Sequence, residues 1–149
     1  MREIDVVVGD EVSEEFPLAP DRVKSYAARL FHDYDIDRYT VNIVFIGDQY
    51  MTEINETYRK RPGTTDVLSF NLSDENLSVF EGEVYISFDR AAKQAAQWDV
   101  TIEEELIRLV THGLLHLTGR THQTIEEYKS LMEETERYVR GFFEGGEHT

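Results

Sequence analysis

The sequence predicts a single α+β domain, in which a mixed sheet of about four strands packs against about five helices. Short runs of β-branched and aromatic residues predict the strands, at residues 4–8, 39–46, 66–71 and 83–88. Longer segments with apolar residues every three or four positions predict the helices. Residues 1–149 contain no internal repeat and no linker, so we expect one domain with a frayed tail from Gly145 and Gly146 onward.

The predicted helices cover residues 21 to about 31, 48–58, 89–98, 101 to about 118, and 124–143. Asp21 and Asp89 are the expected N-caps of two of them, and Thr101 begins a capping box. Tyr58 is expected to point inward from its helix. The spacing of the other tyrosines and phenylalanines predicts core positions and offers no stacking surface for bases.

Composition is typical of a globular protein, with 40% hydrophobic and 30% charged residues. Lys and Arg number 15 against 30 Asp and Glu, and the net charge of −15 argues against broad electrostatic binding of nucleic acid. The absence of Cys leaves histidine and carboxylate as metal ligands. The first residues are acidic and no apolar run has membrane-spanning length, so we expect a cytoplasmic protein without membrane partners.

Three of the five histidines lie within eleven residues, at His112, His116 and His122. Residues four apart on a helix lie on the same side, about 6 Å apart along the axis, so two imidazoles can reach one metal ion. A straight helix would carry His122 about 15 Å away from His112, but a left-handed Gly119 would turn the chain back. Three imidazoles with one open position are typical of a catalytic zinc site, here on a helix and the loop that follows.

The alternative is that these histidines are ordinary core or surface residues without a metal. Their offsets, with glycine at Gly119, equal those of the metzincin pattern H-E-x-x-H-x-x-G-x-x-H, which favours the metal. Gly113 replaces the glutamate that activates water in those proteases. It faces the apolar stripe of the helix and is expected to allow close packing. A protease would therefore need a general base from elsewhere.

The same segment resembles the signature of the bacterial YbeY family, which is close to H-G-x-L-H-L-x-G-x-D-H. Residues 112–119 match it throughout. Upstream matches are N-E-T-Y-R at 55–59, T-D-V-L-S-F at 65–70 and G-E-V-Y-I-S at 82–87, so the resemblance covers about residues 40 to 140. Thr121 stands where the family usually has Asp, and this departure would alter the support of the third histidine.

The resemblance implies a metal-dependent endoribonuclease that cuts single-stranded RNA. It implies action in ribosomal RNA maturation, especially at the 3′ end of the small-subunit RNA, and in ribosome quality control. His112, His116 and His122 would bind one zinc ion, or another divalent metal, and Arg59 would be an essential cation of the active site. The implied partners are single-stranded or ribosomal RNA and the small ribosomal subunit or its assembly proteins.

Arg59, Lys60 and Arg61 form the densest basic cluster. A guanidinium at Arg59 suits the charge of a pentavalent phosphate transition state, although a solvated cation at a helix C-terminus is the alternative. Lys60 and Arg61 are candidates for contacts with the phosphate backbone. Two other functions remain open: a metzincin-like metalloprotease, and a non-catalytic ribosome-assembly factor with a structural metal, which the acidity of the chain favours.

Overall fold

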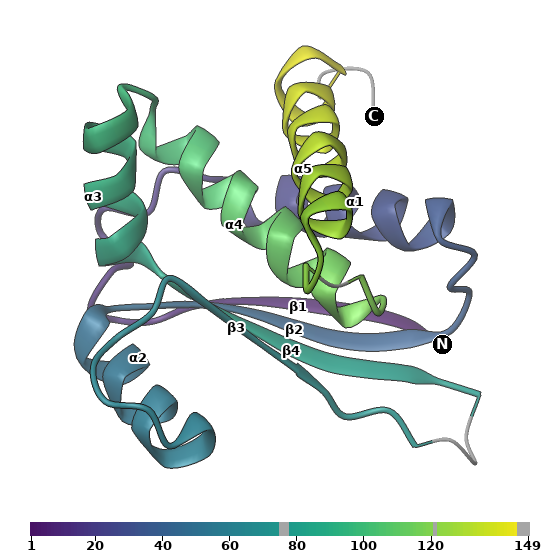
Figure 1. Ribbon diagram of the computed structural model, residues 1–149, viewed down its shortest axis with the longest axis horizontal. Helices are drawn as coiled ribbons and strands as arrows, with labels where there is room; N and C mark the ends of the chain where they lie inside the picture. The colour runs from purple at the N-terminus through teal and green to yellow at the C-terminus, as the bar shows by residue number, and fades with distance from the viewer. Residues whose placement is uncertain (75–77, 121, 146–149) are drawn as a thin grey trace.

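The computed structural model describes residues 1–74, 78–120 and 122–145 (Figure 1). The strands are β1 (Arg2–Val8), β2 (Tyr39–Ile46), β3 (Val67–Asn71) and β4 (Phe80–Ser87). The helices are α1 (Pro20–Asp33), α2 (Asp48–Ile54), α3 (Phe88–Trp98), α4 (Ile102–Leu117) and α5 (Ile125–Gly145), and a π-helical turn, η1 (Asn55–Arg59), continues α2. The predicted α+β domain is confirmed, while the expected frayed tail at residues 146–149 lies outside the described residues.

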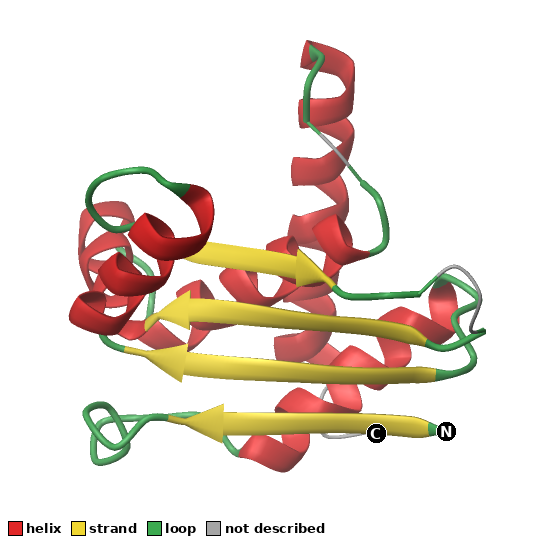
Figure 2. Ribbon diagram, turned by 90° about the horizontal axis from the view of Figure 1, so that it is seen from below, coloured by secondary structure: helices red, strands yellow, loops and turns green. Residues whose placement is uncertain are grey.

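The strands form one mixed sheet in the order β1-β2-β4-β3. β2 pairs in parallel with β1 and β4, whereas β3 runs antiparallel to β4 at the edge (Figure 2). α1, α4 and α5 lie on one side of the sheet and α2 lies on the other (Figure 1). β4 begins at Phe80, three residues earlier than predicted, because Phe80 and Glu81 already pair with β2.

The core lies between the sheet and α4. Alternate residues of the two central strands, Val41 and Ile43 from β2 and Val84 and Ile86 from β4, are buried on this face. The apolar stripe of α4 packs in the same cluster and consists of Leu106, Ile107, Leu109, Val110, Leu114, Leu115 and Leu117. Thr101 caps α4 as predicted, since its hydroxyl accepts a hydrogen bond of 3.1 Å from the amide of Glu104. The helix that carries the first two histidines is therefore fixed along its length.

The two predicted aspartate caps are wrong. Ala19 is the N-cap of α1 and Pro20 opens the helix, because proline has a preset φ and needs no hydrogen-bond acceptor at this position. Asp21 lies in the first turn instead. Ser87 caps α3, and the carboxylate of Asp89 accepts a hydrogen bond from the amide at the start of α2.

The predicted inward orientation of Tyr58 is also wrong. Its side chain is 68% exposed, whereas Met51, one turn into α2, is fully buried. The chain changes from α-helical to π-helical at Asn55, and the extra residue per turn rotates Tyr58 out of the apolar face. In the described ranges, every helix is too short or too polar to cross a bilayer.

Candidate metal centre

α4 presents His112 and His116 on its last turns, at the edge of its buried stripe. The helix lies very close to the sheet at Gly113, because a Cβ atom there would be 2.5 Å from Cγ1 of Val84. The Ser69 hydroxyl of β3 donates a hydrogen bond of 3.0 Å to the carbonyl of Gly113. The expected close packing at Gly113 is confirmed, and the contact leaves no room for a glutamate at this position.

Gly119 reverses the chain after α4. Its φ of 98° is in the left-handed region, and its amide donates a hydrogen bond to the carbonyl of His116. The reversal returns His122, whose ring centre lies 5.1 Å from that of His116 and 6.2 Å from that of His112. The turn expected at Gly119 is therefore observed. Thr121, the position that departs from the family signature, lies outside the described residues.

The three imidazoles are placed to share one ion. The Nε2 atoms of His112 and His116 are 3.0 Å apart, and one nitrogen from each of the three residues lies within 4.8 Å of the others. Nitrogen ligands of tetrahedral zinc are roughly 3.4 Å apart, so small rotations, chiefly of the exposed His122, complete the set. An all-imidazole donor set suits zinc and similar transition metals, whereas magnesium and calcium favour oxygen.

The protein keeps the imidazoles of His112 and His116 in the neutral form that binds metal. Burial, and next the neighbouring His116, lower the pKa of His112 from 6.5 to about 4, while Asp66 acts in the opposite direction. Burial and His122 also lower the pKa of His116, against a hydrogen bond with the backbone of Arg120 that raises it. Both lone pairs are therefore available to a cation near neutral pH.

A cleft of about 390 Å³ opens over the histidines, and β3 forms one wall of it. The wall consists of Val67, Ser69 and Asn71, and it is extended by Thr65 and Asp66 just before the strand. Asn71 is fixed to α4 by a hydrogen bond of 3.3 Å to the carbonyl of Leu117, and Asp66 accepts one of 3.2 Å from Gln94. The sequence interpretation missed Ser69 and Asn71, although small polar residues at alternate positions of an apolar strand were a usable signal.

Arg59 lines the same cleft, at the end of η1. The turn after it is held by the buried Asn55, whose amide group donates to the carbonyls of Arg61 and Gly63 at 3.4 and 3.1 Å. Lys60 takes a left-handed conformation in this turn. Lys60 and Arg61 are exposed beyond the cleft lining, so the structure brings Arg59 to the histidines and leaves the other two cations outside.

Comparison with known proteins gives a consistent family assignment. The family described as "Endoribonuclease YbeY" matches residues 12–142. The Endoribonuclease YbeY of Aquifex aeolicus is 34% identical over 121 residues, which is 80% of each chain. That of Leptospira biflexa is 40% identical over 113 residues, covering 74% of this chain and 70% of the relative.

The fold also matches a solved structure. The solution structure of TM1509 from Thermotoga maritima superimposes with a TM-score of 0.64 at 25% sequence identity. The match covers 97% of this chain and 93% of that protein. Taken with the histidine cluster and the extent of the family match, these similarities show that the chain belongs to the YbeY endoribonuclease family.

Proposed function

We infer that this chain is a zinc-dependent endoribonuclease that cuts single-stranded RNA during ribosomal RNA maturation. The observation that supports this most is the presence of three histidines and Arg59 in one polar cleft. The proposed place of action is the 3′ end of the small-subunit RNA, with a further role in ribosome quality control. These finer assignments rest on the resemblance of the histidine motif and its flanking segments to the family signature.

In this proposal His112, His116 and His122 hold one zinc ion, and another imidazole-binding divalent metal is the alternative. Such an ion, when bound, supplies Lewis acidity toward a phosphodiester oxygen or a water molecule. The chain holds two of these imidazoles, those of His112 and His116, in the neutral form, and it brings all three close together. Burial accounts for the first property through the lowered pKa values, and the reversal at Gly119 accounts for the second.

Arg59 is proposed to bind the reacting phosphate. Its guanidinium offers a planar set of N–H donors, which suits the added negative charge of the transition state. Arg59 lines the cleft beside the histidines and is not itself a metal ligand. Its loss should therefore reduce cleavage while zinc binding stays intact. Lys60 and Arg61, on the exposed turn beyond it, are proposed to contact neighbouring phosphates of the strand.

The net charge of −15 works against general attraction of an RNA polyanion. We therefore propose that the small ribosomal subunit or its assembly proteins bring the chain to its RNA. Maturation of ribosomal RNA would place this activity in the cytoplasm. A peptidase function has less support, because Gly113 is packed against Val84 where the metzincins carry their catalytic glutamate.

The test compares zinc-loaded wild-type chain with His112→Ala and Arg59→Ala on single-stranded RNA, on duplex RNA and on an unfolded protein. Zinc content is measured in the same samples, and Arg38→Gln, an exposed arginine before β2, serves as the control. We expect the wild type to cut single-stranded RNA alone and His112→Ala to lose both zinc and cleavage. Arg59→Ala should keep zinc and lose cleavage by about 100-fold.

Each competing function has its own outcome in this assay. Cleavage of the unfolded protein without cleavage of RNA would indicate a metalloprotease. Ribosome binding without cleavage of any substrate would indicate an assembly factor with a structural metal. Cleavage by Arg59→Ala at the wild-type rate would refute the role given to Arg59.

A further inference from the structure

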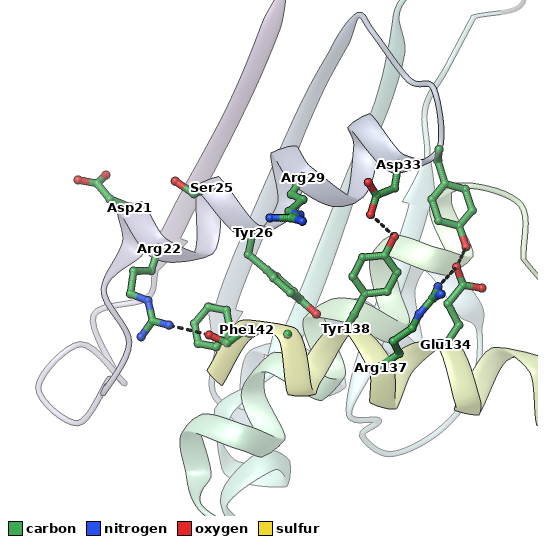
Figure 3. A pocket seen from close by; sticks show the side chains of 12 residues that line it. Asp21, Arg22, Ser25, Tyr26, Arg29, Asp33, Glu134, Arg137, Tyr138 and Phe142 are labelled. Atoms are coloured by element: carbon green, nitrogen blue, oxygen red, sulfur yellow. Dashed lines mark hydrogen bonds and ion pairs between the residues drawn. The ribbon is translucent and has the colours of Figure 1, made fainter. Parts of the chain in front are cut away.

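A second and larger cleft, of about 840 Å³, lies between α1 and α5, and its side chains point toward each other from the two helices (Figure 3). This volume is in the range of pockets that enclose ligands. The lining combines arginines with aromatic rings, namely Arg22, Arg29, Arg137, Tyr26, Tyr138 and Phe142. The sequence spacing predicted core positions for these tyrosines, and in the structure Tyr26 and Tyr138 are only partly buried.

The tyrosines of this cleft offer ring surface rather than hydroxyl groups. The hydroxyl of Tyr26 is engaged with Thr111 of α4, and that of Tyr138 donates a hydrogen bond of 2.7 Å to Asp33. The rings of Tyr26 and Tyr138 meet edge to face at a centroid distance of 6.4 Å, and Phe142 packs edge to face on Tyr26 at 5.2 Å. The guanidinium of Arg137 lies over the Tyr138 ring at 5.5 Å, and that of Arg22 lies over Phe142 at 4.1 Å. A ligand with a flat ring would therefore bind at the partly exposed Tyr26 or replace Arg137 over Tyr138.

The formal charges that line the cleft balance, but one of its arginines has no partner among the described residues. Its lining holds three arginines and three acids, in a chain where acids outnumber basic residues two to one. Asp33 accepts a hydrogen bond from Tyr138, and Glu134 accepts hydrogen bonds from Tyr34 and Arg120. Two of the arginines are also engaged: Arg137 pairs with Glu134 at 3.5 Å, and Arg22 donates a hydrogen bond of 2.9 Å to the carbonyl of Phe142. Arg29, in contrast, makes no hydrogen bond or ion pair with any described residue. Its donors are therefore available to a ligand.

Gly141 leaves space at the α5 side of the cleft. It lies inside α5, where glycine costs about 1 kcal/mol relative to alanine. A Cβ atom on Gly141 would meet no other part of the described structure within 4 Å, so packing within the chain does not require glycine here. The residue lines the cleft and leaves its floor open for close approach to the backbone of α5.

We propose that this cleft binds one nucleotide of the single-stranded RNA substrate, with its base against Tyr26 and Tyr138 and its phosphate on Arg29. The identity of the ligand rests on the proposed function. A nucleotide combines a flat ring with an anion, and within RNA an unpaired strand presents the ring for stacking. An acidic peptide would satisfy Arg29 and leave the aromatic surface unused.

The cleft also adjoins the loop that carries the third histidine. The guanidinium of Arg120, two residues before His122, binds Glu134 and donates a hydrogen bond of 3.1 Å to the hydroxyl of Tyr34. Glu134 and Tyr34 both line the cleft between α1 and α5. A strand bound there would therefore lie beside the two residues that hold Arg120, in the segment before the third histidine.

The test measures binding of a labelled single-stranded RNA of about 12 nucleotides by fluorescence anisotropy, while a gel shows that the RNA is still intact. The zinc-loaded full chain is compared with Arg29→Gln and Gly141→Met, and Arg140→Gln, an exposed arginine of α5 outside the cleft, is the matched control. Arg29→Gln should weaken binding about five- to tenfold and reduce the slope of log affinity against log salt by about 0.7. Gly141→Met should weaken binding to a similar degree without lowering Tm, and Arg140→Gln should change affinity less than about twofold.

Cleavage assays on the same samples separate this inference from the proposed function. If Arg29→Gln loses RNA binding and no variant cuts RNA, the cleft assignment stands and the proposed function fails. If Arg29→Gln and Gly141→Met bind like the wild type, the cleft assignment is overturned while cleavage still supports the proposed function. A wild type that binds no single-stranded RNA also overturns it. The cleft assignment is also overturned if binding of a labelled acidic peptide, or of free adenosine monophosphate, depends on Arg29 while RNA binding does not.

Discussion

Replacing Gly113 by alanine adds one methyl group at the closest contact between α4 and the sheet. The new Cβ would lie 2.5 Å from Cγ1 of Val84 and 3.1 Å from both the Ser69 hydroxyl oxygen and Cγ2 of Val67. Carbon atoms pack at about 3.5–4.0 Å, so the two elements must separate by about 1 Å at this point. Val84 is fully buried, and it has no solvent-filled space into which it can turn.

Two opposing effects set the change in the free energy of unfolding for Gly113→Ala. Overpacking a core costs about 1–3 kcal/mol, and three simultaneous close contacts place Gly113→Ala near the upper value. Alanine in a helix interior recovers about 1 kcal/mol relative to glycine. We therefore expect the free energy of unfolding to fall by about 2 kcal/mol. The displaced helix also carries His112, so zinc affinity should fall at least about tenfold.

Gly141→Ala is the matched control, since it is the same substitution inside another helix and its Cβ meets nothing within 4 Å in the described structure. Chemical denaturation of the metal-free proteins should show this variant to be up to about 1 kcal/mol more stable than the wild type. Zinc titration should give wild-type affinity for it. The double variant Gly113→Ala with Val84→Ala should lose about 1 kcal/mol less stability than the sum of the losses in the two single variants, because Val84→Ala removes the clash.

The reasoning is refuted if Gly113→Ala matches or exceeds the stability of the wild type and binds zinc with unchanged affinity. Strict additivity of Gly113→Ala and Val84→Ala would refute it as well. Either result would mean that the approach of α4 to the sheet is not limited by this contact.

The remaining predictions concern charge and metal. Burial lowers the pKa of His112 to about 4, so between pH 6.5 and 4 the unfolded chain takes up a proton that the native protein does not. The metal-free protein should therefore lose up to about 3 kcal/mol of stability on acidification through this window. Urea titrations at each pH should show that His112→Gln loses measurably less. Arg108 bridges carboxylates that include the buried Glu105 at 2.8 Å. Arg108→Met should therefore lower the free energy of unfolding by roughly 3 kcal/mol, because it leaves that carboxylate unpaired. The double variant Arg108→Met with Glu105→Gln should lose clearly less, and chemical denaturation measures both. Zinc at about 100 times its Kd should stabilise the wild type by about 2.7 kcal/mol in thermal unfolding. His116→Ala should abolish this stabilisation. An equal stabilisation of His116→Ala would mean that the ion binds elsewhere.

Much of the fold could be predicted because its signals are local. The alternation of apolar residues identified β2 to the residue, and the capping box at Thr101 identified the start of α4. Tyr58 was misplaced because its orientation depends on a π-helical turn, which Asn55 stabilises through carbonyls six and eight residues further along the chain. A periodicity analysis assumes a constant helical repeat and does not detect such a change.

The candidate site likewise has features that the local sequence predicts and features that depend on contacts distant in sequence. The histidine spacing and the reversal at Gly119 are properties of eleven consecutive residues, so the sequence was sufficient to place them together. Ser69 and Asn71 reach α4 through hydrogen bonds that span 44 and 46 residues of sequence. Their alternation on an apolar strand was a local signal, but it did not indicate which helix they contact. The cleft between α1 and α5 was hidden for another reason: Tyr26 has the spacing of a core residue, and only the packing of two distant helices leaves its ring exposed to a cleft.

The geometry of the histidines is therefore set by contacts that are remote from them in sequence. On one side, Gly113 lets α4 rest against Val84, which fixes the height of the first two histidines above the sheet. On the other side, Glu134 of α5 and Tyr34 after α1 hold Arg120, which fixes the loop that brings in the third. The two anchors lie on different elements, so a change that moves α5 relative to α4 would separate the third histidine from the others without altering any ligand. If the cleft between α1 and α5 binds RNA as proposed, the bound strand would contact Tyr34 and Glu134, which form the second anchor.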